Sequence, residues 1–129
     1  NQRAVDERDF DAIEHEMRGV AEFCRAHGMR DKVIVEMPKL ESEADKRRVC
    51  EIALKARPAF LKTSSGRPYQ ATLDDVRLMA EVLGDKVQVK AAGGIRTYGQ
   101  AKAFIEAGAS ALGATAGIAI VEGERAAGA

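Results

Sequence analysis

Hydrophobic residues along the chain alternate between helical and strand-like patterns. Residues 10–27 carry apolar side chains at helical spacing behind a potential cap at Asp9, and the apolar run 33–35 follows. Three further capped helices are expected, each ahead of another apolar run. Their caps are predicted at Ser42, Thr72 and Thr97, and the strands that follow at residues 60–61, 87–89 and 111–113. A helix and strand repeated about every 25 residues predict a parallel sheet covered by helices.

Alternation within the strands assigns their side chains to two faces. One face is apolar, with Val33, Val35, Leu61, Val87 and Val89. The other carries polar residues at the carboxyl ends of the strands, with Ile34, Glu36, Phe60, Lys62, Gln88 and Lys90. An open doubly wound sheet packs both faces under helices, whereas a barrel interior accommodates polar groups at its carboxyl-end mouth. The pattern therefore favours an α/β fold of the (β/α)8 TIM barrel type.

Composition narrows the classes of function. The 129 residues are 46% hydrophobic and 31% charged with no net charge, as in ordinary globular domains, and give no electrostatic footprint for nucleic acid. No apolar run reaches the roughly 18 residues of a membrane span, and a cytoplasmic location is expected. Cys24 and Cys50 lack a metal-binding spacing and are expected to be buried free thiols. No metal or cofactor is predicted.

Two lysines are the first candidates for chemistry. Lys62 and Lys90 are expected to end neighbouring strands about 4.8 Å apart and to point into one cavity. Repulsion between the ammonium groups, with desolvation added, should lower the pKa of at least one of them and supply a free amine that can attack an aldehyde. The alternative is that each lysine is simply solvated at a strand end.

Two glycine-rich segments are candidates for binding a phosphate. Gly93-Gly94 precedes the helix capped by Thr97, and residues 113–117 precede the last segment, so both offer backbone N–H groups near a helix start. A phosphate site after the last two strands is frequent in (β/α)8 enzymes. The alternative is that these glycines only allow tight turns.

At these residues the chain resembles a known family. The stretch 60–66, FLKTSSG, resembles the Schiff-base strand KTSTG of the 2-deoxyribose-5-phosphate aldolase family, and 89–97, VKAAGGIRT, resembles its KASGGIRT segment. The resemblance implies a class I aldolase in which Lys62 forms the Schiff base and Lys90 lowers its pKa and assists proton transfer. It implies an aldehyde and a phosphosugar as small-molecule partners. The implied substrate-binding residues are Thr63, Ser64, Ser65, Gly66, Arg67, Gly93, Gly94, Gly113 and Thr115, with Gly93, Gly94 and Thr115 at the phosphate.

Three segments depart from the family pattern. Residues 67–70, RPYQ, replace a glycine-containing loop that is one residue longer, residues 36–40 replace a segment with Thr-Gly, and Ala114-Thr115 stand where Thr-Ser is common. These changes bear on the choice of substrate. A related aldolase with a different acceptor is therefore an alternative reading.

The predicted strands account for only part of a barrel. About 200 residues are the least a (β/α)8 barrel uses, and the resemblance makes residues 1–129 the C-terminal half of one domain. Residues 1–3 are expected to continue from a preceding strand, and the family's catalytic Asp lies upstream of them. An N-terminal half-barrel segment, or a second copy of the chain, is the expected macromolecular partner. A non-catalytic half-barrel that binds a phosphosugar is the other alternative.

Overall fold

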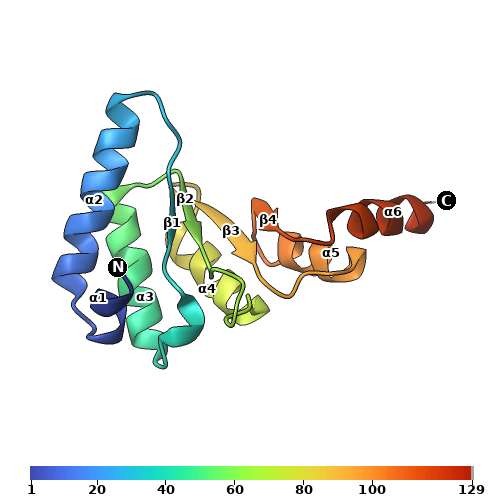
Figure 1. Cartoon of the computed structure of the whole chain (residues 1–129), viewed down its shortest axis with the longest axis horizontal. Coiled ribbons are helices and arrows are strands. Elements are labelled where there is room, and N and C mark those ends of the chain that lie inside the picture. The colour runs from blue at the N-terminus through green and yellow to red at the C-terminus, as the bar shows by residue number, and fades with distance from the viewer. Residues whose placement is uncertain (129) are drawn as a thin grey trace.

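Four parallel strands lie side by side in chain order in the computed structural model, which describes residues 1–128 (Figure 1). The register aligns Ile34 with Lys62, Lys62 with Lys90, and Lys90 with Ala111. The elements are α1 (Gln2–Asp6), α2 (Phe10–Ala26), β1 (Lys32–Ile34), the 3-10 helix η1 (Met37–Lys39), α3 (Glu43–Ala56), β2 (Phe60–Lys62), α4 (Leu73–Leu83), β3 (Gln88–Ala92), α5 (Tyr98–Glu106), β4 (Ala111–Gly113) and α6 (Gly117–Ala127).

The helices begin where the sequence predicts caps. In α2, α3, α4 and α5 the cap side chain accepts the backbone N–H three residues further on, at 3.0 to 3.3 Å. At α5 the bond is reciprocal, because the Gln100 side chain also accepts the N–H of Thr97. These caps satisfy backbone donors that the first turn of a helix leaves unpaired. They fix where each helix starts relative to the strand before it.

At α1 the Asn1 side chain accepts the N–H of Ala4 and caps the helix, and a strand before Asn1 stays a prediction. One expectation about the strands needs correction. Lys90 does not end its strand, since β3 continues to Ala92. The extension follows from pairing on both sides, with Thr63 bound to the Lys90 carbonyl and Ala92 aligned with Gly113. Lys90 is consequently the middle residue of β3 and not its last.

The two faces of the sheet differ as the alternation predicts. Leu61, Val89 and Ala91 are buried on the face that packs against the helices. On the other face Lys62 and Lys90 are half-buried and Ile34 is 40% exposed. Four consecutive parallel strands with helices behind them and polar groups in front form half of a (β/α)8 barrel.

The ends of the half-barrel have different surroundings. Helices α2 and α3 lie side by side at the β1 end, whereas α6 projects away from the sheet at the β4 end (Figure 1). No residue of α6 within the described chain is buried.

Cys50 is buried as expected, but Cys24 is only half-buried, and both are free thiols. None of the helices in residues 1–128 is long and apolar enough to cross a membrane.

Candidate active site

Lys62 is the last residue of β2 and lies directly opposite Lys90 of β3. Neighbouring strands are about 4.8 Å apart, and residues aligned in a parallel pair share a face of the sheet. Both side chains therefore emerge beside one another on the face that the helices leave uncovered. This juxtaposition is the one that the alternation predicts.

The pKa of Lys62 is lowered from its ordinary value. Burial is the largest cause, followed by repulsion from Lys32 and then from Lys90, while the charge of Glu36 opposes the shift. A lowered pKa increases the fraction of free amine near neutral pH. The lowering was expected, but the order of its causes was not, because desolvation exceeds the effect of either neighbouring lysine.

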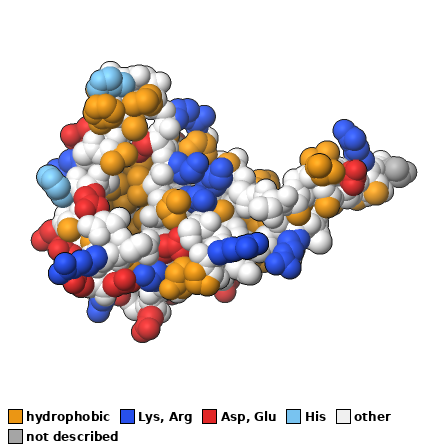
Figure 2. All heavy atoms as spheres, viewed as in Figure 1, with side chains coloured by type: hydrophobic (Ala, Val, Ile, Leu, Met, Phe, Trp, Pro, Cys, Tyr) orange, Lys and Arg blue, Asp and Glu red, His pale blue; other side chains and the backbone are white. Residues whose placement is uncertain are grey.

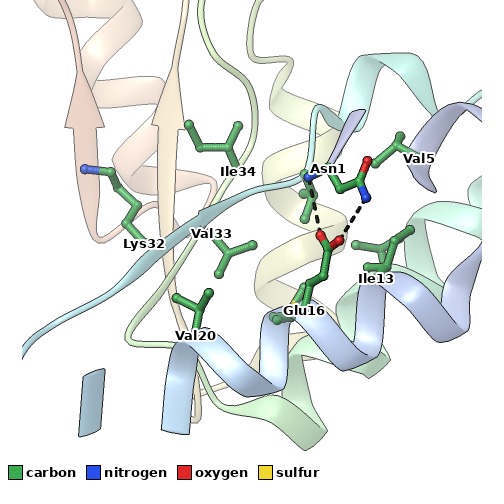
Figure 3. A pocket seen from close by; sticks show the side chains of 11 residues that line it. Asn1, Val5, Ile13, Glu16, Val20, Lys32, Val33 and Ile34 are labelled. Carbon is green, nitrogen blue, oxygen red and sulfur yellow. Dashed lines mark hydrogen bonds and ion pairs between the residues drawn. The ribbon is translucent and has the colours of Figure 1, made fainter. Parts of the chain in front are cut away.

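Lys32 is a charged neighbour of Lys62 that was not predicted, because its charge contributes to the lowered pKa of Lys62. It lies at the start of β1, two residues before Ile34, and so belongs to the same face as Lys62. Figure 3 shows Lys32 directed away from Val20 of α2. The alternation that selected Ile34 and Glu36 also selects Lys32, so the signal was present in the sequence. Lys and Arg side chains gather over the middle of one face of the molecule in Figure 2.

A cavity of about 960 Å³ opens beside Lys62 at the carboxyl ends of β2, β3 and β4. Most of the predicted site residues line it, namely Lys62, Ser65, Gly66, Arg67, Gly93, Gly94, Gly113 and Thr115. Lys90, Thr63 and Ser64 do not. Arg96 also lines the cavity, although no role was predicted for it. It lies two residues after Gly94, and with Arg67 it places two guanidinium groups at a glycine-rich wall.

Thr63 and Ser64 join β2 to β3 rather than facing the cavity. Both residues are fully buried. The Ser64 hydroxyl donates to the Ala92 carbonyl at 2.6 Å, and the Thr63 hydroxyl accepts the Ala92 N–H at 3.2 Å. Buried polar groups are costly unless they are hydrogen-bonded, and these bonds satisfy them. A direct contact of either hydroxyl with substrate remains a prediction.

Gly93 and Gly113 allow close approaches that a side chain would prevent. Gly93 has φ +95°, and a Cβ there would lie 3.0 Å from the Cα of Gly66 and 2.9 Å from the Tyr69 carbonyl oxygen. A Cβ on Gly113 would lie 3.0 Å from the Cβ of Ala92, which is tighter than an ordinary contact, and 3.5 Å from Cε of Lys90, which is an ordinary van der Waals distance. The loop after β2 is thereby held against the loop after β3, and the Lys90 stem lies over β4.

The site combines a lysine of lowered pKa with a glycine-rich cavity wall. Within residues 1–128, no group of three His, Cys, Asp or Glu side chains is arranged to hold a metal ion. A half-barrel with a lysine of lowered pKa and a glycine-lined cavity at its strand ends defines a site of the class that (β/α)8 enzymes build.

Comparisons with known proteins find similarity to aldolases. The chain is 45% identical over 123 residues to a deoxyribose-phosphate aldolase of Thermococcus gammatolerans, an alignment covering 95% of this chain and 54% of that protein. An aldolase named QR15 superposes with a TM-score of 0.82 at 36% identity over 95% of this chain and 54% of that one. A putative deoxyribose-phosphate aldolase from Coccidioides immitis superposes with a TM-score of 0.83 at 32% identity, covering 97% and 50%.

Over 93–95% of its length the chain is similar to proteins named deoxyribose-phosphate aldolase. It spans about half the length of the curated relatives that it matches. No family model matches it.

Proposed function

We propose that this chain carries the Schiff-base lysine of a class I aldolase that makes and cleaves 2-deoxyribose 5-phosphate. The observation that carries the proposal is Lys62, a lysine of lowered pKa that lines a cavity at the carboxyl end of a strand. The identity to proteins named deoxyribose-phosphate aldolase supports the substrate. Lys90, its partner across the strands, is assigned to proton transfer.

The chemistry follows from a neutral amine at Lys62. Its nitrogen attacks the carbonyl carbon of acetaldehyde, and the carbonyl oxygen takes a proton to give a carbinolamine. Loss of water leaves a cationic iminium, and loss of a proton from the adjacent carbon gives an enamine. The enamine carbon then attacks the aldehyde carbon of glyceraldehyde 3-phosphate, whose oxygen is protonated. Hydrolysis of the new iminium releases the sugar and restores Lys62.

The glycine-rich wall is the proposed binding region for the acceptor's phosphate. Gly93 and Gly94 precede α5, and Gly113 and Thr115 precede α6, where backbone N–H groups suit an anion. Arg67, on the loop facing them, adds positive charge with a geometry that suits phosphate oxygens.

A different acceptor is the second candidate, and one contact favours it. The Gln70 side chain lies over Gly94, with Oε1 2.6 Å from the position of a Cβ on that glycine. It therefore occupies space next to the proposed phosphate region. Turnover measured with glyceraldehyde 3-phosphate and with unphosphorylated aldehydes separates the two candidates. A preference for unphosphorylated acceptors that Gln70→Gly reverses would favour the second.

Reductive trapping tests the amine chemistry. Borohydride with acetaldehyde should attach a two-carbon group to the Lys62 peptide, and Lys62→Ala should abolish the adduct. Lys102→Ala is the matched control, because Lys102 is exposed on α5 away from the cavity. An adduct on Lys90 or on a helix lysine, with Lys62 unmodified, would contradict the assignment. No adduct at any lysine would favour a non-catalytic phosphosugar-binding half-barrel.

A complementary half-barrel is the proposed macromolecular partner. Strands β1 and β4 each bond to a single neighbour in the described sheet, so each presents unpaired backbone groups at its other edge. Closing a barrel removes such edges. An N-terminal half-barrel segment is preferred over a second copy, because two copies would bring two lysine pairs into one mouth. Light scattering with mass spectrometry distinguishes them, and a cooperatively melting monomer of 129 residues would refute both. A cytoplasmic location stays a prediction.

A further inference from the structure

Glu36 occupies an unusual position at the carboxyl end of β1. Its backbone is left-handed, with φ +47° and ψ +55°, and its side chain is 98% buried, since only 2% is exposed. A residue other than glycine in this conformation costs about 1–2 kcal/mol. The residues on either side continue the pairing with β2, because Val35 N–H donates to the Lys62 carbonyl and Met37 N–H to the Thr63 carbonyl. The fold therefore fixes Glu36 beside the catalytic strand.

The Glu36 carboxylate binds the loop that follows Lys62. Its Oε1 accepts the backbone N–H of Ser65, and its Oε2 is buried without a hydrogen-bond partner in the described chain. Two other carboxylates also have a buried oxygen without a hydrogen-bond partner, those of Asp31 and Asp75. Asp31 lies at the opposite end of β1 and Asp75 pairs with Lys46 between α3 and α4. Of these three carboxylates, Glu36 is the one at the carboxyl end of a strand.

The charges around Glu36 are mostly positive. Lys62 is influenced by Lys32 from β1, by Lys90 from β3 and by Glu36, which is the negative group among them. Lys39 of η1 also lies within the influence of Glu36. Removing the Glu36 charge would therefore leave only repulsive charge effects on the Lys62 amine.

We propose that Glu36 is a positioning residue for Lys62, which holds the loop after β2 through Ser65 and supplies the negative charge that balances the cationic iminium on the Lys62 nitrogen. The inference rests on the proposed function, in which that iminium forms. It assigns the two oxygens different tasks. One orders the loop, and the other leaves negative charge available while the nitrogen is cationic in the iminium.

Two substitutions separate these tasks. Glu36→Gln keeps an oxygen that can accept the Ser65 N–H but removes the charge. Glu36→Gly removes both and relieves the left-handed backbone, so loss of folding is not expected to obscure the result. Asp31→Asn is the matched control, because Asp31 also accepts a backbone N–H, that of Ala59 at 2.7 Å, yet lies at the other end of β1.

Three measurements on the intact protein give the outcome. Competitive acetylation across pH, read at the Lys62 peptide, reports the titration midpoint of its amine without requiring turnover. Hydrogen exchange reports protection of the Ser65 amide. Borohydride trapping with acetaldehyde reports the iminium.

Glu36→Gln should lower the Lys62 midpoint by on the order of half a unit, about threefold in the acid equilibrium, and reduce trapping at saturating acetaldehyde while Ser65 stays protected. Glu36→Gly should also lose Ser65 protection. Asp31→Asn should leave the Lys62 midpoint unchanged.

An unchanged midpoint in Glu36→Gln, with trapping equal to that of the unsubstituted protein, would overturn the inference and leave the proposed function intact. Absence of trapping at Lys62 in the unsubstituted protein would instead overturn the proposed function. The acetylation midpoint would then still report whether the Glu36 charge acts on Lys62.

Discussion

Substituting Gly93 by alanine tests whether the two loops of the site are held in direct contact. An alanine Cβ would lie 2.9 Å from the Tyr69 carbonyl oxygen and 3.0 Å from the Cα atoms of Gln70 and Gly66. All three contacts are to backbone atoms, which cannot rotate away as a side chain can. The loop after β2 must therefore move before the substituted residue fits.

The expected cost has two parts. The φ of +95° at Gly93 is unfavourable for any residue with a Cβ, by about 1–2 kcal/mol. Displacing packed backbone adds about 1–3 kcal/mol. Gly93→Ala should lower the free energy of unfolding by about 2–5 kcal/mol. Gly94→Ala should cost less, about 1–2 kcal/mol, because its closest contact is the flexible Gln70 side chain.

Urea unfolding of the variants measures these differences, with Gly99→Ala as the control. Gly99 lies in α5 with no atom within 4 Å of its Cβ position, so alanine should stabilise the helix by about 0.5–1 kcal/mol. Gly93→Ala should also weaken binding of phosphorylated substrate. If Gly93→Ala unfolds at the same urea concentration as Gly99→Ala, the close approach of the two loops is wrong.

Three further predictions follow from the charges and the thiols. Lys62→Met should be more stable than the unsubstituted protein at pH 7 by under about 1 kcal/mol, because the environment that lowers the pKa of Lys62 destabilises the folded protein only while the lysine is charged. The gain should therefore fade as the pH rises toward the ordinary lysine pKa. Urea midpoints at pH 7 and 10 measure this difference. Lys32→Met should raise the Lys62 acetylation midpoint at least as much as Lys90→Met does, and no effect of Lys32→Met would contradict the order of causes. A thiol reagent at pH 8 should label Cys24 but not Cys50, whose burial raises its pKa to about 12, and fast labelling of Cys50 in folded protein would show otherwise.

Much of the fold was predictable because its signals are local. Caps at Ser42, Thr72 and Thr97 depend on residues three positions apart, and all three form as expected. The facing of Lys62 and Lys90 depends only on alternation along each strand, and the register confirms it. The resemblance to the aldolase family rests on two short motifs, residues 60–66 and 89–97.

The remaining features depend on contacts between distant segments. Nothing local marks Glu36 as a left-handed residue whose carboxylate reaches Ser65, 29 positions away. The extension of β3 to Ala92 requires pairing with β4, which a single strand does not encode. Desolvation as the main cause of the Lys62 pKa shift likewise depends on how the whole mouth is packed.

The two buried hydroxyls after Lys62 also constrain how β2 can slide along β3. A slip of one residue would turn Lys62 toward the helices and bring an apolar side chain to the mouth. It would also separate the Ser64 hydroxyl and the Thr63 hydroxyl from Ala92, leaving buried polar groups unpaired. Hydroxyls that need not touch substrate thus act as a register lock. Varying them to alter specificity would disturb the alignment of the reactive lysine before it altered recognition.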